Sequence, residues 1–93
     1  MSEFSDRTPV VLSLSSHDPS GSTGIQADIE TAISLGAHCC AVVTALCARD
    51  TRQLVDLAPT PADLLIEQTR AILEDMPVAA IKLGYFCRVE QIE

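Results

Sequence analysis

The stretch SSHDPSGSTGIQAD, residues Ser15 to Asp28, decides the fold of this chain. It follows an apolar strand candidate, Val10 to Leu14, and it leads into an amphipathic helix candidate that begins near Gly24. Its centre, DPSG at 18–21, is turn sequence, because proline fixes φ and glycine allows positive φ. A strand, a turn and then the amide end of a helix is how an α/β protein makes a binding loop. The alternative is an ordinary capped turn without a ligand.

The first helix is predicted from about Gly24 to Leu35, and Gly36 is the expected C-cap. Thr23 and Gln26 have the spacing of a capping box, in which Thr23 is the N-cap and Gln26 reaches back to its amide. One face of this helix is expected to pack on the sheet through four apolar residues: Ile25, Ile29, Ala32 and Ile33.

Two more strands and a second helix follow. The run Cys39 to Leu46 is almost continuously apolar, which is typical of a parallel strand covered on both faces. Residues 49–59 are expected to form a loop, and a short extra strand over 54–57 is the alternative. A second helix begins with Thr60 as N-cap, Pro61 at its first position and Asp63 near its positive end, and it stops before Pro77. Its buried residues are expected to be Leu64, Leu65, Ala71 and Ile72.

The third strand is predicted over Val78 to Leu83, broken by Gly84, and residues 88–93 are typical of the first turn of another helix. This order predicts three parallel strands joined by right-handed crossovers. Ligands of such sheets bind beyond the carboxyl ends of the strands. The loops expected there are Ser15 to Gly24, Cys47 to Thr51 and Gly84 to Cys87.

Composition limits the classes of function. Ninety-three residues allow one domain, and 47% apolar residues with a mean hydropathy of +0.25 indicate a globular one. A net charge of −7 argues against nucleic acid and anionic membranes as partners, since both require basic patches. No apolar run approaches the roughly 20 residues of a membrane-spanning helix. The N-terminal residues lack the apolar core of a signal peptide, so a cytoplasmic protein is expected.

Four cysteines occur, at positions 39, 40, 47 and 87, without zinc-ligand spacing, so no metal site is expected. Cys39 and Cys40 are adjacent in a strand candidate and should point to opposite faces as reduced core residues. Cys47 and Cys87 lie near strand ends, where a reactive thiol is the alternative to a structural one.

The quoted stretch resembles the N-terminal signature of the hydroxymethylpyrimidine and phosphomethylpyrimidine kinases of thiamine biosynthesis, a ribokinase-like family with the form GxDPSGGAGIQAD. The resemblance continues through LGAHCCAVVTALCARDT (35–51) and AAIKLGYF (79–86) in the same order. It implies a three-layer α/β fold with a parallel sheet, of which residues 1–93 form the N-terminal βαβαβ portion of a kinase domain. It also implies a small-molecule pyrimidine substrate, and it leaves open a homo-oligomer of the complete protein.

The resemblance also assigns substrate-binding residues. Backbone groups near Ser16, Gly21 and Thr23 would close over the pyrimidine, and Asp28 stands where the family places an acidic side chain close to it. Arg49 occupies the position of a glutamine that reads the aminopyrimidine edge, and Tyr85 that of a methionine against the ring. The alternatives are structural: Asp28 as a helix-dipole partner, Arg49 in an exposed ion pair and Tyr85 as a packing aromatic.

Departures from the family pattern bear on function. GSTG replaces GGAG in the first loop, and Arg49 offers donors but no acceptor, which would suit a phosphorylated or acidic ligand better than a neutral alcohol. The complete family kinase would use ATP and Mg²⁺, but its nucleotide site and catalytic base lie in a C-terminal part beyond these motifs. No GxxxxGK[ST] or GxGxxG motif occurs in this chain. We therefore predict no catalytic residue, no cofactor and no independent phosphoryl transfer for these 93 residues.

Three rival interpretations remain. A related kinase could act on another small alcohol such as pyridoxal. A non-catalytic fragment could instead fold with, and bind to, a partner chain. A phospho-acceptor or flavodoxin-like domain is disfavoured, because only Asp18 lies at the end of the first strand where such a domain would cluster carboxylates.

Overall fold

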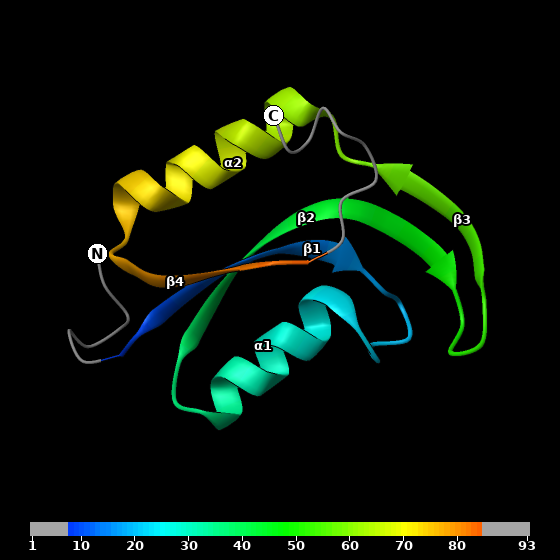
Figure 1. Cartoon of the computed structure of the whole chain (residues 1–93), viewed down its shortest axis with the longest axis horizontal. Helices are drawn as coiled ribbons and strands as arrows, with labels where there is room; N and C mark the ends of the chain where they lie inside the picture. The colour runs from blue at the N-terminus through cyan, green and yellow to red at the C-terminus, as the bar shows by residue number, and fades with distance from the viewer. Residues whose placement is uncertain (1–7, 85–93) are drawn as a thin grey trace.

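A computed structural model describes residues 8–84, which form one mixed sheet and two helices (Figure 1). The elements in chain order are β1 (Val10–His17), α1 (Gly24–Ser34), β2 (His38–Arg49), β3 (Leu54–Pro59), α2 (Ala62–Asp75) and β4 (Val78–Leu83). The strand order is β3-β2-β1-β4. β1 pairs in parallel with both β2 and β4, whereas β3 pairs antiparallel with β2. The predicted α/β fold with three parallel strands is confirmed.

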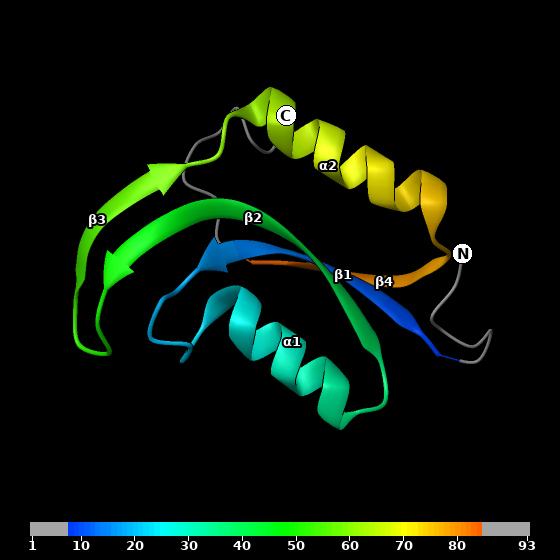
Figure 2. The ribbon, with the colours of Figure 1, turned by 180° about the vertical axis from the view of Figure 1, so that it is seen from behind.

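The two helices cover opposite faces of the sheet, giving three layers (Figures 1 and 2). α2 lies over the face where the main apolar core forms. Leu12 of β1, Val42 of β2 and Leu65 of α2 are 0%, 1% and 2% exposed. Val10, Leu14 and Cys40 complete this core, and Ile72, Met76 and Val78 pack against it. Long apolar β1 and β2 side chains thus hold α2 to the sheet.

α1 covers the other face through Ile25 and Ala32, which are both buried. Ile29 is partly buried, but Ile33 is 67% exposed, so its predicted burial is wrong. The C-cap is Leu35, one residue before the predicted Gly36, and Gly36 follows it with φ +78°. The N–H of Gly36 donates to Ile33 O, and that of Ala37 donates to Ala32 O. This paired bonding satisfies carbonyls that the end of a helix leaves open.

α2 begins one residue later than predicted, because Thr60 is held by the sheet. The Thr60 hydroxyl donates to Val43 O at 2.7 Å and its N–H to Thr44 O at 2.8 Å, so Pro61 takes the N-cap position. The expected stop before Pro77 is confirmed, since α2 ends at Asp75. Leu65 is buried and Ile72 partly so, but Leu64 and Ala71 are exposed, and their predicted burial is wrong.

The region after Leu46 is more regular than predicted. β2 continues through Arg49 and forms a hairpin with β3, which pairs along its edge from Ala45. Asp50 makes the turn, because its carboxylate accepts the N–H groups of Arg52 and Gln53 at 2.8 and 2.9 Å. The open alternative of a short strand near 54–57 is therefore correct, and the expected loop over 49–59 is reduced to this turn.

The two adjacent cysteines lie as the alternation of a strand predicts. Cys40 is buried with its thiol 3.5 Å from Met76 Sδ under α2, whereas the half-buried Cys39 lies near charged groups of the opposite face. Burial raises the pKa of both thiols. Cys39, Cys40 and Cys47 are all free thiols, and Cys87 lies outside the described residues.

Candidate functional site at the carboxyl ends of the parallel strands

The carboxyl ends of β1, β2 and β4 lie at one edge of the sheet, because the three strands run in parallel. The pairing reaches His17 with Leu46 on one side and Leu14 with Leu83 on the other. Directly after β4, the N–H of Gly84 donates to Leu14 O at 2.7 Å. Gly84 begins the loop expected over Gly84 to Cys87. It therefore lies next to β1, the strand that leads into the loop expected over Ser15 to Gly24.

Asp18 is the centre of the loop between β1 and α1. Its side chain is 1% exposed. Oδ1 accepts the N–H of Ser20 at 2.9 Å and the Ser20 hydroxyl at 2.7 Å. Oδ2 accepts the Ser22 hydroxyl at 3.1 Å and, from Thr23, the N–H at 3.1 Å and the hydroxyl at 2.9 Å. The loop is therefore wrapped around one carboxylate.

These donors set the electrostatics of the loop. The pKa of Asp18 lies well below its ordinary value, chiefly because the Ser20 hydroxyl bonds the carboxylate. Burial opposes this shift, and the remaining donors from Ser20, Thr23 and Ser22 add to it. A buried anion requires such partners, since an unpaired charge in this position would be strongly destabilising. At neutral pH Asp18 is a fully bonded anion.

The geometry of the loop requires glycine at position 24. Gly24 has φ +72° and forms an isolated antiparallel bridge with His17, which folds the loop back onto the end of β1. A Cβ at this position would overlap the carbonyl oxygen of Ser16. Glycine alone combines a positive φ with this close approach of two backbones.

The predicted capping box does not form. Thr23 is the N-cap, but the structure gives it no side-chain cap bond, and its hydroxyl donates to Asp18 instead. Gln26 bonds forward to Glu30, with Nε2 3.1 Å from Oε2. The Thr23 hydroxyl donates to a charged carboxylate, and this strong, charge-assisted bond orients the side chain toward Asp18.

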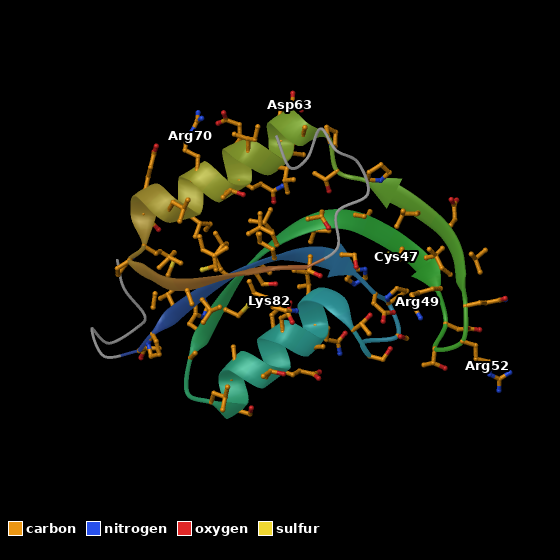
Figure 3. The ribbon with its side chains drawn as sticks, in the orientation of Figure 1. Cys47, Arg49, Arg52, Asp63, Arg70 and Lys82 are labelled. Carbon is orange, nitrogen blue, oxygen red and sulfur yellow. The ribbon has the colours of Figure 1, made fainter. Side chains whose placement is uncertain are left out.

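Asp28 of α1 lies against the sheet and connects three elements. Its Oδ2 accepts the hydroxyl of the buried Ser13 of β1 at 2.6 Å, and its Oδ1 lies 2.6 Å from Nζ of Lys82 in β4. The Asp28 side chain is 13% exposed and that of Lys82 54%. Figure 3 shows Lys82 between the sheet and α1.

Arg49, the last residue of β2, lies beside the first loop (Figure 3). Its Nε is 3.8 Å from Asp18 Oδ1 and donates to the carbonyl of Asp50 at 2.9 Å. The side chain is 27% exposed. The ion pair is therefore long and partly solvated, and it adds little to the stability of the loop compared with the hydroxyl and amide donors.

The structure thus brings together four of the predicted binding residues: Ser16 is the last but one residue of β1, Gly21 and Thr23 lie in the loop, and Arg49 lies beside it. Asp28 does not lie in this loop. It is on α1, where it bonds to Ser13 of β1 and Lys82 of β4. Tyr85 lies outside the described residues. The roles of all six in binding stay predictions.

Sequence reasoning treated Asp18 as a turn residue and as a lone carboxylate at the end of the first strand, and missed it as the centre of the loop. The signal was present in DPSGST, where one aspartate is followed within five positions by three hydroxyl residues. A shallow depression of about 210 Å³ lies elsewhere, across β2 and β3, lined by Leu46, Cys47, Ala48, Asp56, Leu57 and Ala58. It contains none of the predicted binding residues.

Two other kinds of feature, a metal-binding cluster and a membrane-spanning helix, are absent from residues 8–84. Within this range no group of three or more His, Cys, Asp or Glu side chains is placed to hold a metal ion. Neither helix of the same range is long and apolar enough to cross a membrane. Every buried side-chain nitrogen or oxygen in it has a hydrogen-bond partner. The β1–α1 loop and its neighbours remain the candidate site.

Solved structures of other proteins share the overall fold of this chain. Phosphomethylpyrimidine kinase from Clostridium difficile matches 91% of this chain with a TM-score of 0.86 and 30% identity, over 37% of its own length. Pyridoxal kinase from Staphylococcus aureus in complex with AMP-PCP and pyridoxal matches 91% with a TM-score of 0.80 and 30% identity, over 32% of its length. The fold and the site loop therefore define the class as a ribokinase-like small-molecule kinase fold.

The sequence comparisons narrow this class. The family model for phosphomethylpyrimidine kinase matches residues 18–93. The hydroxymethylpyrimidine/phosphomethylpyrimidine kinase of Aquifex aeolicus is 36% identical over 84 residues, which are 90% of this chain and 33% of that protein. The chain belongs to the phosphomethylpyrimidine kinase family, and it spans about a third of the length of this curated relative.

Proposed function

We propose that this chain is the pyrimidine-binding part of a kinase that phosphorylates 4-amino-5-hydroxymethyl-2-methylpyrimidine and its monophosphate with ATP. The observation that carries the proposal is the loop wrapped around Asp18 at the carboxyl ends of parallel strands, in a chain of this family. Ligands bind at this edge in open parallel sheets. We also expect the cytoplasm as its location and a small molecule, not nucleic acid, as its ligand.

In this proposal Ser16, Gly21, Thr23, Asp28, Arg49 and Tyr85 surround the pyrimidine. The N–H of Gly21 donates to Asp18 O at 2.9 Å, and that of Thr23 donates to the Asp18 carboxylate. Both amides are therefore committed to the loop, and Gly21 and Thr23 would meet a ligand through their other atoms. Asp28 would act indirectly, because both of its oxygens are bonded to Ser13 and Lys82.

We place the nucleotide, Mg²⁺ and the catalytic base outside these 93 residues, in the C-terminal part that relatives carry beyond the matched region. ATP would supply the phosphoryl group, and Mg²⁺ would neutralise its developing charge. The exposed apolar side chains of β4 support additional covering structure over this strand in a complete kinase: Ile81 and Leu83 are 54% and 68% exposed. Parallel strands are normally covered on both faces.

The test is calorimetric titration of the purified chain with 4-amino-5-hydroxymethyl-2-methylpyrimidine, followed by an assay with the same alcohol and Mg-ATP. We expect saturable binding and no phosphorylated product. Failure to bind would contradict the proposed pyrimidine site. Steady turnover of ATP and alcohol by the chain would contradict our placement of the nucleotide site and base elsewhere.

Pyridoxal is the second candidate ligand. The similarity to Staphylococcus aureus pyridoxal kinase in complex with pyridoxal, with a TM-score of 0.80, favours it. Arg49 in place of glutamine also removes an acceptor for an aminopyrimidine. Competition between pyridoxal and the pyrimidine alcohol for the chain would decide, because the preferred ligand displaces the other at the lower concentration.

A further inference from the structure

Asp18 differs from every other carboxylate of residues 8–84 in the number of protein donors that it accepts. Five hydrogen bonds end on its two oxygens, and they come from Ser20, Ser22 and Thr23. A carboxylate so occupied has little capacity left to take a proton from a substrate or to coordinate an ion. Its bonds instead fix the positions of the residues around it.

We propose that Asp18 is a positioning residue, whose buried carboxylate holds the loop 18–24 in its ligand-receiving conformation before any ligand arrives. The inference rests on the proposed function for the identity of the ligand only. It assigns to Asp18 a role in shaping the loop, while Ser16, Gly21 and Thr23 are the residues that would meet the ligand.

The physical reason lies in the composition of the loop. Serine, threonine and glycine give a chain with many accessible conformations, so an unrestrained loop would lose much entropy on binding. The apparent affinity for a ligand equals the intrinsic affinity multiplied by the fraction of molecules that already have the binding conformation. Ser20 donates to Oδ1 of Asp18 and Thr23 donates to Oδ2. These bonds close the loop around the carboxylate and remove most of that entropy loss.

The donors are also arranged to keep the carboxylate charged. The Ser20 hydroxyl makes the shortest bond to Asp18, at 2.7 Å, and it is the main cause of the lowered pKa of Asp18. Because the folded-state pKa lies below the unfolded value, this stabilisation is complete above the ordinary aspartate pKa of about 3.9. It is lost only as the pH falls through the lower, folded-state pKa.

The experiment compares the wild-type chain with Ser20→Ala and Asp18→Asn, and Asp50→Asn is the matched control. Asp50 also accepts two backbone amides in a turn, but in the exposed β2–β3 hairpin. Amide exchange of Ser20 and Thr23, followed by NMR, reports the loop, and sheet amides such as that of Leu12 report global unfolding. Titration of the pyrimidine alcohol reports affinity.

We expect Ser20→Ala and Asp18→Asn to speed exchange at Ser20 and Thr23 while the sheet amides keep their protection. Ser20→Ala should also move the acid opening of the loop to higher pH, which a merely structural residue would not do. The affinity should fall about tenfold, the equivalent of one bond to a charged acceptor. Asp50→Asn should leave the amides of the loop 18–24 unchanged.

Unchanged loop amides in a folded Ser20→Ala chain, with an unchanged pH profile, would overturn the inference. So would equal affinity of wild type and Asp18→Asn when both are folded. If Asp18→Asn does not fold, Ser20→Ala decides, because it leaves the carboxylate in place. If the wild-type chain does not bind the pyrimidine, the proposed function fails, and the amide exchange and pH profile still decide the role of Asp18.

Discussion

The two faces of the sheet differ in chemistry, although they share the same strands. On the face toward α2, Leu12 and Val42 of the sheet pack with Leu65 of α2 in an apolar core. The face toward α1 carries Ser13, which is 1% exposed and bonded to Asp28. Alternate residues of β1 therefore supply an aliphatic core on one side and a polar network on the other.

The two faces therefore make different contributions, one to the stability of the fold and the other to the alignment of the site. Apolar burial is non-directional and tolerates small shifts of the helix, whereas a charge bonded at 2.6 Å to each of two partners fixes α1 in one position. α1 follows directly after the Asp18 loop. The polar face thus aligns the helix that carries the site, and the apolar face supplies most of the free energy that keeps the sheet folded.

The largest effect is expected in the apolar face. Leu12→Ala should lower the free energy of unfolding by about 2–5 kcal/mol, because Leu12 is 0% exposed and truncation leaves a cavity. Urea unfolding followed by circular dichroism measures it. The matched control is Leu83→Ala at the exposed edge of β4, where the change should stay within about 0.5 kcal/mol. Equal losses for the two variants would contradict the assignment of the core to this face.

A smaller loss is expected in the polar face. Asp28→Ala removes the acceptor of the buried Ser13 hydroxyl and should lower the free energy of unfolding by about 1–3 kcal/mol. Lys82→Met keeps the aliphatic stem, and it should cost less, since the ammonium group is largely solvated. The same urea titrations compare the two. Asp28→Ala removes both bonds and Lys82→Met removes the ion pair alone, so equal losses would mean that the ion pair rather than the Ser13 bond holds α1.

Arg49 lies outside this network, 3.8 Å from Asp18 in the loop that leads into α1. Arg49→Gln should strengthen binding of the pyrimidine alcohol by about 0.5–1.5 kcal/mol, up to about tenfold, since glutamine restores an acceptor. It should weaken binding of the monophosphate relative to the alcohol, because a cation is removed. Calorimetric titration with both ligands measures the ratio. If neither affinity nor the ratio changes, Arg49 serves Asp18 alone and does not contact the ligand.

The sequence alone was sufficient for much of the fold. Continuous apolar runs predicted the parallel strands, and β4 was placed at its observed bounds, because apolar periodicity and breaking residues act locally. Thr23 and Thr60 were assigned as capping side chains, yet each bonds elsewhere, to Asp18 and to Val43. Such bonds depend on which acceptor the folded chain brings near. Local sequence patterns could not predict the Asp28–Lys82 pair for the same reason, because its residues are 54 positions apart.

The smallest effect is expected at Ile33, where the predicted burial was wrong. Its side chain is 67% exposed on α1, so Ile33→Gln should change the free energy of unfolding by no more than about 0.5 kcal/mol. Glutamine is also a slightly better helix former than isoleucine, which offsets the small apolar contact that is lost. Urea unfolding of this variant beside Ala32→Gln, at the buried neighbour, measures the contrast. A loss at Ile33 as large as that at Ala32 would mean that a further surface covers this end of α1 in solution. The packing of α1 would then include contacts in addition to those with the sheet.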